Sequence, residues 1–179
     1  MMMSLSSLET ILIGTLSGET DMAGDGIRMD IRVELNGFDR RMLIAAGKLE
    51  DYKTPLRRSE TWMEKSVGMR FRTAAWKPLA PFTLKIHRHR IGGKPLNDTG
   101  ALKLSITTGV ANKLSKKKLQ IRSNLKKAWQ HNFGGTTSWG THVPARPFLY
   151  FDEKDKQMVK RIFQDYVDDL VREVNNGNR

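Results

Sequence analysis

The sequence predicts an α+β fold in which a small antiparallel sheet packs against two central helices and a C-terminal amphipathic helix. Three observations lead to this prediction. Apolar and polar residues alternate over residues 27–35, which is typical of a half-buried strand. The same alternation returns over residues 102–110 and 119–123. Residues 159–174 carry an apolar stripe with the spacing of a helix.

The chain of 179 residues is long enough for one domain with its own core. We place this domain at residues 27–174, after a flexible leader of residues 1–26 and before a disordered tail of residues 175–179. The absence of cysteine excludes disulfide bridges and thiolate metal sites. No window approaches eighteen consecutive apolar residues, and the first residues lack the pattern of a secretory signal, so we expect no membrane partner.

Two central helices are predicted after the first strand. Apolar residues recur at helical spacing over residues 38–52 and again over residues 54–73. In the second helix, Thr54 suits the N-cap and Pro55 suits the first helical position, where a missing N–H costs least. Prolines make residues 75–84 irregular, and a short helix or turn is expected to follow.

The second half of the domain is predicted to contain a hairpin and a terminal helix. Residues 102–110 and 119–123 form the two arms of an antiparallel hairpin, with Lys116, Lys117 and Lys118 at its tip. Asp152 can cap the terminal helix, and Asp155 places a second acid near the positive end of the helix dipole.

The loop of residues 129–150 is the segment that we expect to be most important for function. Pro144 and Pro147 favour extended backbone, and the Gly134-Gly135 pair suits a sharp turn, so the loop is expected to hold one shape and present its side chains. Because Trp, Tyr and Arg dominate interface energetics, we interpret the loop as a docking surface rather than a catalytic pocket. For Arg146, bonds within the subunit and across an interface are equally open. The candidate interface residues are Trp129, His131, Phe133, Trp139, Arg146 and Phe148.

The net charge of +12 comes almost entirely from one quarter of the chain. Residues 85–127 contain 12 lysines and arginines and one acidic residue, Asp98. Such clustering indicates either a solvated basic surface or a face that meets nucleic acid or an acidic partner, and charge alone leaves both open. The candidate basic-face residues are Lys113, Lys116, Lys117, Lys118, Arg122, Lys126 and Lys127.

Motifs for catalysis or cofactor binding are weak in this sequence. There is no glycine-rich phosphate loop and no dinucleotide fingerprint. His87 and His89 have the spacing of metal ligands on a strand, but they lie among cations, and no nearby carboxylate or cysteine completes the set. We interpret His131 as a histidine that bonds the loop backbone rather than as part of a nuclease site. We therefore expect no enzymatic activity, no cofactor and no metal ion.

Four short segments carry a recognisable signature. They are Trp76-Lys77-Pro78-Leu79 with Thr83; Leu96-Asn97-Asp98-Thr99-Gly100-Ala101-Leu102 with Ser105-Ile106; His131-Asn132-Phe133-Gly134-Gly135; and Pro144-Ala145-Arg146-Pro147-Phe148-Leu149. In this order, and followed by an amphipathic helix, they resemble the phage virion morphogenesis or tail completion proteins of contractile-tailed phages and Mu-like prophages. The resemblance covers about residues 27–174.

This resemblance implies a structural protein that completes the tail and helps to join it to the head, commonly as a ring. The implied partners are further copies of the chain and neighbouring neck or tail proteins, with at most weak, sequence-independent contact with DNA. The implied location is the virion tail or neck, after assembly in the cytoplasm of the bacterial host. The alternative left open is a basic nucleic-acid-binding module independent of virions, which would bind DNA tightly as a monomer.

Overall fold

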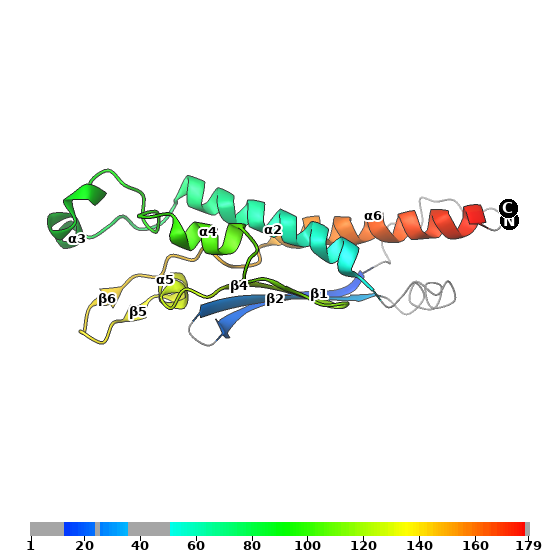
Figure 1. Ribbon diagram of the computed structural model, residues 1–179, viewed down its shortest axis with the longest axis horizontal. Coiled ribbons are helices and arrows are strands. Elements are labelled where there is room, and N and C mark those ends of the chain that lie inside the picture. The colour runs from blue at the N-terminus through cyan, green and yellow to red at the C-terminus, as the bar shows by residue number, and fades with distance from the viewer. Residues whose placement is uncertain (1–12, 24–25, 36–50, 178–179) are drawn as a thin grey trace.

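A computed structural model describes residues 13–23, 26–35 and 51–177 (Figure 1). Two long helices, α2 (Lys53–Thr73) and α6 (Glu153–Gly177), lie on one face of an antiparallel sheet. The fold is therefore α+β, which confirms the predicted fold class. The predicted helix at residues 38–52 falls almost entirely outside the described residues.

Within the described residues, the sheet has four strands in the order β1 (Ile13–Ala23), β2 (Gly26–Leu35), β4 (Lys118–Ser123) and β3 (Lys113–Leu114). Every neighbouring pair is antiparallel. The prediction of a flexible leader is wrong for β1, which pairs with β2 along nearly its whole length. Local composition misled here, because a glycine-rich strand is stabilised by pairing with its neighbour rather than by its own propensity.

The alternation predicted for the first strand is confirmed in β2. Ile27, Met29 and Ile31 are fully buried beneath the helices, together with Leu119 and Ile121 of β4. Neighbouring β2 residues alternate to the opposite, polar face of the sheet, as period-two geometry requires.

Helix α2 confirms the second predicted central helix, with one change at its start. The helix begins at Lys53 with Tyr52 as N-cap, so the predicted capping role of Thr54 is wrong, and Pro55 is the third rather than the first helical residue. Its buried stripe includes Leu56, Met63 and Phe71. These side chains lie seven and eight residues apart, about two helical turns each, so they share one face of α2 and form the helical side of the core.

Helix α6 confirms the predicted terminal helix and extends it. Val159, Phe163 and Val167 are buried at four-residue spacing along its core-facing side. The helix continues to Gly177, so the predicted disordered tail is wrong for residues 175–177.

The first arm of the predicted hairpin is a helix instead, α4 (Ala101–Thr107). Leu102 and Ile106 are buried, whereas Leu104 is 55% exposed. Residues two positions apart would share one strand face, but residues four apart also share a helix face, so the sequence pattern fits both structures. Gly100, with φ of 75°, starts the helix in a conformation that favours glycine.

A shorter hairpin replaces the predicted one, formed by β3 and β4. Lys116 and Lys117 lie at its tip as predicted, whereas Lys118 is the first residue of β4 and pairs across the sheet with Arg32. The tip is tied to the start of α2, because the Tyr52 amide donates a hydrogen bond of 2.8 Å to the Lys116 carbonyl.

Two projections extend beyond the sheet at one end of the long axis (Figure 1). One contains α3 (Pro81–Ile86) and the 3-10 helix η2 (Arg88–Arg90). The other contains the small hairpin of β5 (Gly135–Thr136) and β6 (His142–Val143), which follows α5 (Ala128–Phe133). The C-terminal end of α6 lies at the opposite end of the molecule. Within the described part of the chain, none of the helices combines the length and the hydropathy that a membrane span requires.

Candidate functional site

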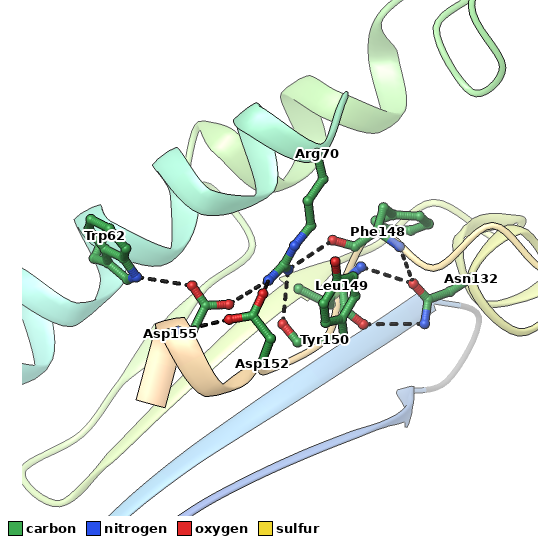
Figure 2. Close-up of polar contacts among 8 residues, drawn as sticks. All are labelled: Trp62, Arg70, Asn132, Phe148, Leu149, Tyr150, Asp152 and Asp155. Atoms are coloured by element: carbon green, nitrogen blue, oxygen red, sulfur yellow. Dashed lines mark hydrogen bonds and ion pairs between the residues drawn. The ribbon is translucent and has the colours of Figure 1, made fainter. Parts of the chain in front are cut away.

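The segment of residues 144–150 connects β6 to α6 without regular secondary structure. Side chains of α2 and α5 bind the backbone of its last three residues (Figure 2). We call this arrangement the clasp and define it by Arg70, Trp76, Asn132 and Arg146. Extended backbone pairs with no strand here, so its polar groups need side-chain partners. The clasp residues supply them.

Asn132 on α5 binds the backbone of this segment at three points (Figure 2). Its Oδ1 accepts hydrogen bonds of 2.9 Å from the amides of Phe148 and of Leu149, and its Nδ2 donates to the Leu149 carbonyl at 3.3 Å. Asn132 is only 3% exposed, so water cannot easily replace these bonds. An amide side chain is needed because it carries both an acceptor and a donor.

Arg70 on α2 connects the same segment to the start of α6 (Figure 2). Its Nη1 donates to the carbonyls of Phe148 and Tyr150, at 3.3 and 2.9 Å. Its Nη2 donates to Asp152 at 3.2 Å and to Asp155. The guanidinium also lies 3.6 Å from the centre of the Tyr150 ring, in cation–π geometry.

The two aspartates at the start of α6, Asp152 and Asp155, both accept hydrogen bonds from Arg70 and from one further donor each. Asp152 Oδ1 accepts from the Asp155 amide at 2.8 Å, which confirms the predicted cap. Asp155 is 1% exposed, and its second oxygen accepts from the Trp62 indole at 3.0 Å. Burial disfavours ionisation of Asp152, but hydrogen bonds from the Asp155 amide and the charge of Arg70 outweigh it and hold the pKa of Asp152 below its usual value.

Trp76 and Arg146 complete the clasp. The Trp76 indole donates to the Pro147 carbonyl at 2.7 Å. Arg146 Nε and Nη2 donate to the carbonyls of Lys77 and Pro78, at 3.0 and 3.1 Å. Of the two roles open for Arg146, the structure therefore shows bonds within the subunit, to backbone carbonyls. The prolines on either side leave few alternative backbone shapes, so the arginine meets these carbonyls in a fixed position.

The clasp brings three of the four signature segments together, since Trp76, Asn132 and Arg146 each belong to a different one. The fourth segment, which begins at Leu96, does not join the clasp. Its Asp98 Oδ1 lies 3.3 Å from His89 Nε2 and 3.7 Å from Arg90 Nε. In the same segment, Thr99 accepts a hydrogen bond from the Ala101 amide. The signature residues thus mainly fix backbone shape.

An open groove of about 770 Å³ lies next to the clasp, between the two projections. Its apolar lining includes Leu79, Phe82, Leu96 and Val143. Among the residues that the structure describes, its charged lining consists of the cations Lys77, Arg90, Lys126, Lys127 and Arg146 and the carboxylate of Asp98. We call this feature the basic groove. Its electrostatic character favours an anionic occupant.

The projections around the basic groove expose large apolar side chains. Phe82 is 71% exposed and Trp139 is 88% exposed, and Ile86, Ile91 and Phe133 are also exposed. Exposed apolar residues gathered at one end of a monomer are typical of protein–protein contact surfaces. We call this end of the molecule the docking end.

The six candidate interface residues divide between the core and this surface. Phe148 is fully buried and Arg146 is 6% exposed, so the prediction that the loop presents these two side chains is wrong. Trp129 is half-buried and packs against the core. Of the six, Trp139 is 88% exposed and Phe133 about half exposed, at 49%.

His131 is half-buried at the edge of the basic groove. Its carbonyl accepts from the Arg146 amide at 2.9 Å, but its side-chain Nδ1 is buried without a hydrogen-bond partner among the described residues. The expected side-chain bond to the loop backbone is therefore not seen at Nδ1. Burial, reinforced by the charges of Arg146, Lys127 and Arg90, lowers the pKa of His131 and favours the neutral ring.

The predicted basic face is divided into two regions. Lys113, Lys116, Lys117, Lys118 and Arg122 belong to the β3–β4 hairpin. There, Lys118 and Arg122 lie opposite Arg32 and Arg28 on the polar face of the sheet, and Asp30 accepts an ion pair of 2.9 Å from Lys118. Lys126 and Lys127 instead line the basic groove.

Sequence reasoning missed Arg70 and underestimated Asn132. Arg70 contacts residues about 80 positions further along the chain, and nothing in its local pattern indicates those partners. Asn132 lay within a signature segment, but a polar residue beside two glycines is equally typical of a turn. His87 immediately precedes η2 and His89 lies within it. The described residues contain no group of three His, Asp or Glu side chains that could hold a metal ion.

The protein is a small α+β domain whose scaffold is held together by the clasp. Its docking end exposes apolar and basic side chains of the kind that contact other macromolecules. The chain belongs to the phage virion morphogenesis family, whose family model matches residues 33–168. Membership of this family indicates a structural part in building a phage particle.

A curated relative supports the same assignment. The Mu-like prophage FluMu G protein 2 of Haemophilus influenzae is 34% identical over 127 residues, which cover 68% of this chain and 83% of that protein. No solved structure matches the chain significantly.

Proposed function

We propose that this protein completes the phage tail and helps to join it to the head, acting through protein–protein contacts as a ring and without catalysis. Family membership carries the proposal. The proposed partners are further copies of the chain and neighbouring neck or tail proteins. The proposed location is the tail or neck of the virion, after assembly in the host cytoplasm.

The docking end supports a role in contacts. Trp139 and Phe82 are mostly exposed, although large aromatic side chains gain most from burial. Their burial against a neighbour would stabilise an assembly without changing the subunit. The clasp supports the same role, because it fixes the base from which these side chains project.

Electron microscopy of induced lysates tests this proposal. We expect deletion of the gene to give separate heads and tails, and complementation with the wild-type gene to restore joined particles. The matched variants are Trp139→Ser, at the docking end, and Val110→Ser, at a position that is equally exposed (88%) but lies outside it. We expect Trp139→Ser to fail in complementation and Val110→Ser to succeed. Normal joined particles without the gene would refute the proposed function.

A second candidate function, contact with DNA, rests on the charges of the hairpin and the sheet. Arg28 and Arg32 extend the basic region of β4 across the polar face of the sheet. We expect replacement of Lys116, Lys117 and Lys118 by Gln to reduce DNA retention by the purified protein, most clearly at low salt. Unchanged retention at every salt concentration would eliminate this role for the hairpin tip.

A further inference from the structure

Charge is distributed unevenly along helix α6. Residues 153–163 contain four cations and two acids, whereas residues 164–177 contain four acids and one cation. The acids of the second part are Asp165, Asp168, Asp169 and Glu173. The first three are exposed, and Asp169 Oδ1 lies 3.7 Å from Arg172 Nη1.

This acidic half is unfavourable for the isolated helix in two ways. The C-terminal end of a helix carries a partial negative charge, which stabilises cations and disfavours acids, yet the last turn of α6 has no basic residue. Acids three or four residues apart also repel each other, as Asp165 does with Asp168 and Asp169. Consistently, burial together with Asp165 and Asp169 raises the pKa of Asp168 despite Arg172. An external cationic partner would relieve both costs.

The basic groove has the complementary composition. Lys77 and Lys127 present exposed side chains there, and Arg90, Lys126 and Arg146 add three further charges. Asp98, the one carboxylate lining it among the described residues, is already close to His89 and Arg90. Apolar side chains such as Phe82 and Leu79 line the same groove and offer contact for the aliphatic parts of an inserted helix.

The two complementary surfaces belong to opposite ends of one molecule (Figure 1). The basic groove lies between the projections, and the acidic half of α6 runs toward the other end of the long axis. A single copy therefore cannot bring them together. Two copies can, and because the paired surfaces differ, one copy keeps a free acidic helix and the other keeps a free basic groove.

We propose that the basic groove binds the acidic C-terminal half of α6 from a second copy of this chain. Repeated head-to-tail contacts of this kind generate a closed ring when the rotation between copies closes, and a filament when it does not. The proposal rests on the ring in the proposed function and names the surfaces that form it. Charge complementarity of this kind fixes the partner and the register of the contact.

Charge exchange tests the contact in complementation of the deletion. The groove variant is Lys77→Glu with Lys127→Glu, and the helix variant is Asp165→Lys with Asp168→Lys. We expect each variant alone to reduce joined particles by at least about tenfold, because like charges then face each other. The four substitutions combined are expected to restore joining. Failure of the combined variant to improve on either parent would overturn the proposal.

A matched control separates this pairing from a general effect of charge. Lys116→Glu with Lys117→Glu makes the same change of charge at the hairpin tip, outside the basic groove. We expect the helix variant to be no better when combined with it. Equal restoration by the hairpin and groove variants would show that net charge, rather than this contact, matters, and would overturn the proposal. If the groove variant loses DNA retention and its combination with the helix variant does not restore joined particles, DNA rather than α6 would be identified as the occupant of the basic groove.

The absence of cysteine allows a direct test by crosslinking. We expect Lys127→Cys and Asp168→Cys in one chain to give a ladder of multimers with a short bismaleimide in induced lysates, ending at the ring size. A mixture of the two single variants is expected to stop at dimers, because each molecule then has one reactive end. A tail defect on deletion, with neither a ladder nor charge rescue, would overturn this inference alone. A ladder with normal particles after deletion would instead refute tail completion while the contact stands.

Discussion

The clasp and the docking end both draw on the loop of residues 129–150, yet the side chains of this loop are treated in opposite ways in the two regions. Asn132 is 3% exposed and the next residue, Phe133, is 49% exposed. In the clasp, polar side chains are buried and hold backbone groups. At the docking end, apolar side chains such as Phe82 and Trp139 are exposed to water and gain little burial within the subunit.

This difference separates what the subunit needs in order to fold from what it offers to partners. Burying Asn132 or Arg146 costs free energy unless their hydrogen bonds are made, so these residues serve the scaffold. Exposing Trp139 forgoes the gain from burial, which an assembly partner can supply. We therefore expect clasp substitutions to reduce stability and docking-end substitutions to reduce assembly.

The largest loss of stability is expected for Arg70→Met. The substitution leaves the buried Asp155 carboxylate without its ion pair and removes donors to two carbonyls. Breaking one side of a buried ion pair costs about 3–5 kcal/mol of the free energy of unfolding. Denaturant titration measures the change.

Arg72 provides the control for that experiment, because its side chain is exposed on the same helix. We expect Arg72→Met to change the free energy of unfolding by less than about 0.5 kcal/mol. Equal effects of the two substitutions would show that Arg70 acts through helix propensity or surface charge rather than through the clasp.

A smaller loss is expected for Asn132→Ala. The amides of Phe148 and Leu149 then lose their acceptor in a buried environment. An unpaired buried donor costs about 1–3 kcal/mol, so we expect a loss of about 2–3 kcal/mol, with partial rescue by Asn132→Asp, which keeps an acceptor. Asn124→Ala, at an exposed position, is the control, and its expected effect on the denaturation midpoint is negligible.

Acidification is expected to weaken the clasp through Asp152. Its pKa is lower in the folded state than in the unfolded state, so its stabilising contribution is present above the unfolded pKa and is lost as pH falls through the folded pKa. Asp152→Asn is therefore expected to flatten the acid limb of the stability profile and to lower stability near neutral pH. Denaturation midpoints measured from pH 7 down to acid, for both proteins, check this; parallel profiles would contradict it.

The smallest change in stability is expected for Trp139→Ser, because the side chain is 88% exposed. The free energy of unfolding should change by less than about 0.5 kcal/mol, while joined particles decline. Complementation and denaturant titration of the same variant make the test. A variant that loses stability but joins heads and tails normally would reverse our distinction between clasp and docking end.

Local periodicity predicted the regular elements whose burial follows a single pattern. Strand β2 and helices α2 and α6 are confirmed, since their apolar residues repeat over more than two turns or several alternations. The pattern failed at α4, where Leu102 and Ile106 fit both a strand and a helix. It also missed β1, whose place depends on pairing with β2.

The candidate site was predicted only in part, for the same physical reason. Sequence motifs identified the segments that meet at the clasp, but the direction in which Arg146 and Phe148 point depends on contacts with residues far along the chain. Arg70 had no local signal at all. Exposure of Phe133 and Trp139 agrees with the predicted docking role, which stays a prediction.

The sequence by itself determined the α+β class, the faces of the long elements, the cap at Asp152 and the family signature. These properties depend on spacing along the chain and on the backbone preferences of single residues. The tertiary structure decided which signature residues are buried in the clasp, how the basic residues divide between hairpin and groove, and that the basic groove and the acidic half of α6 lie at opposite ends. Those properties depend on packing between distant segments, because burial and local electric field are set by neighbours in space rather than in sequence.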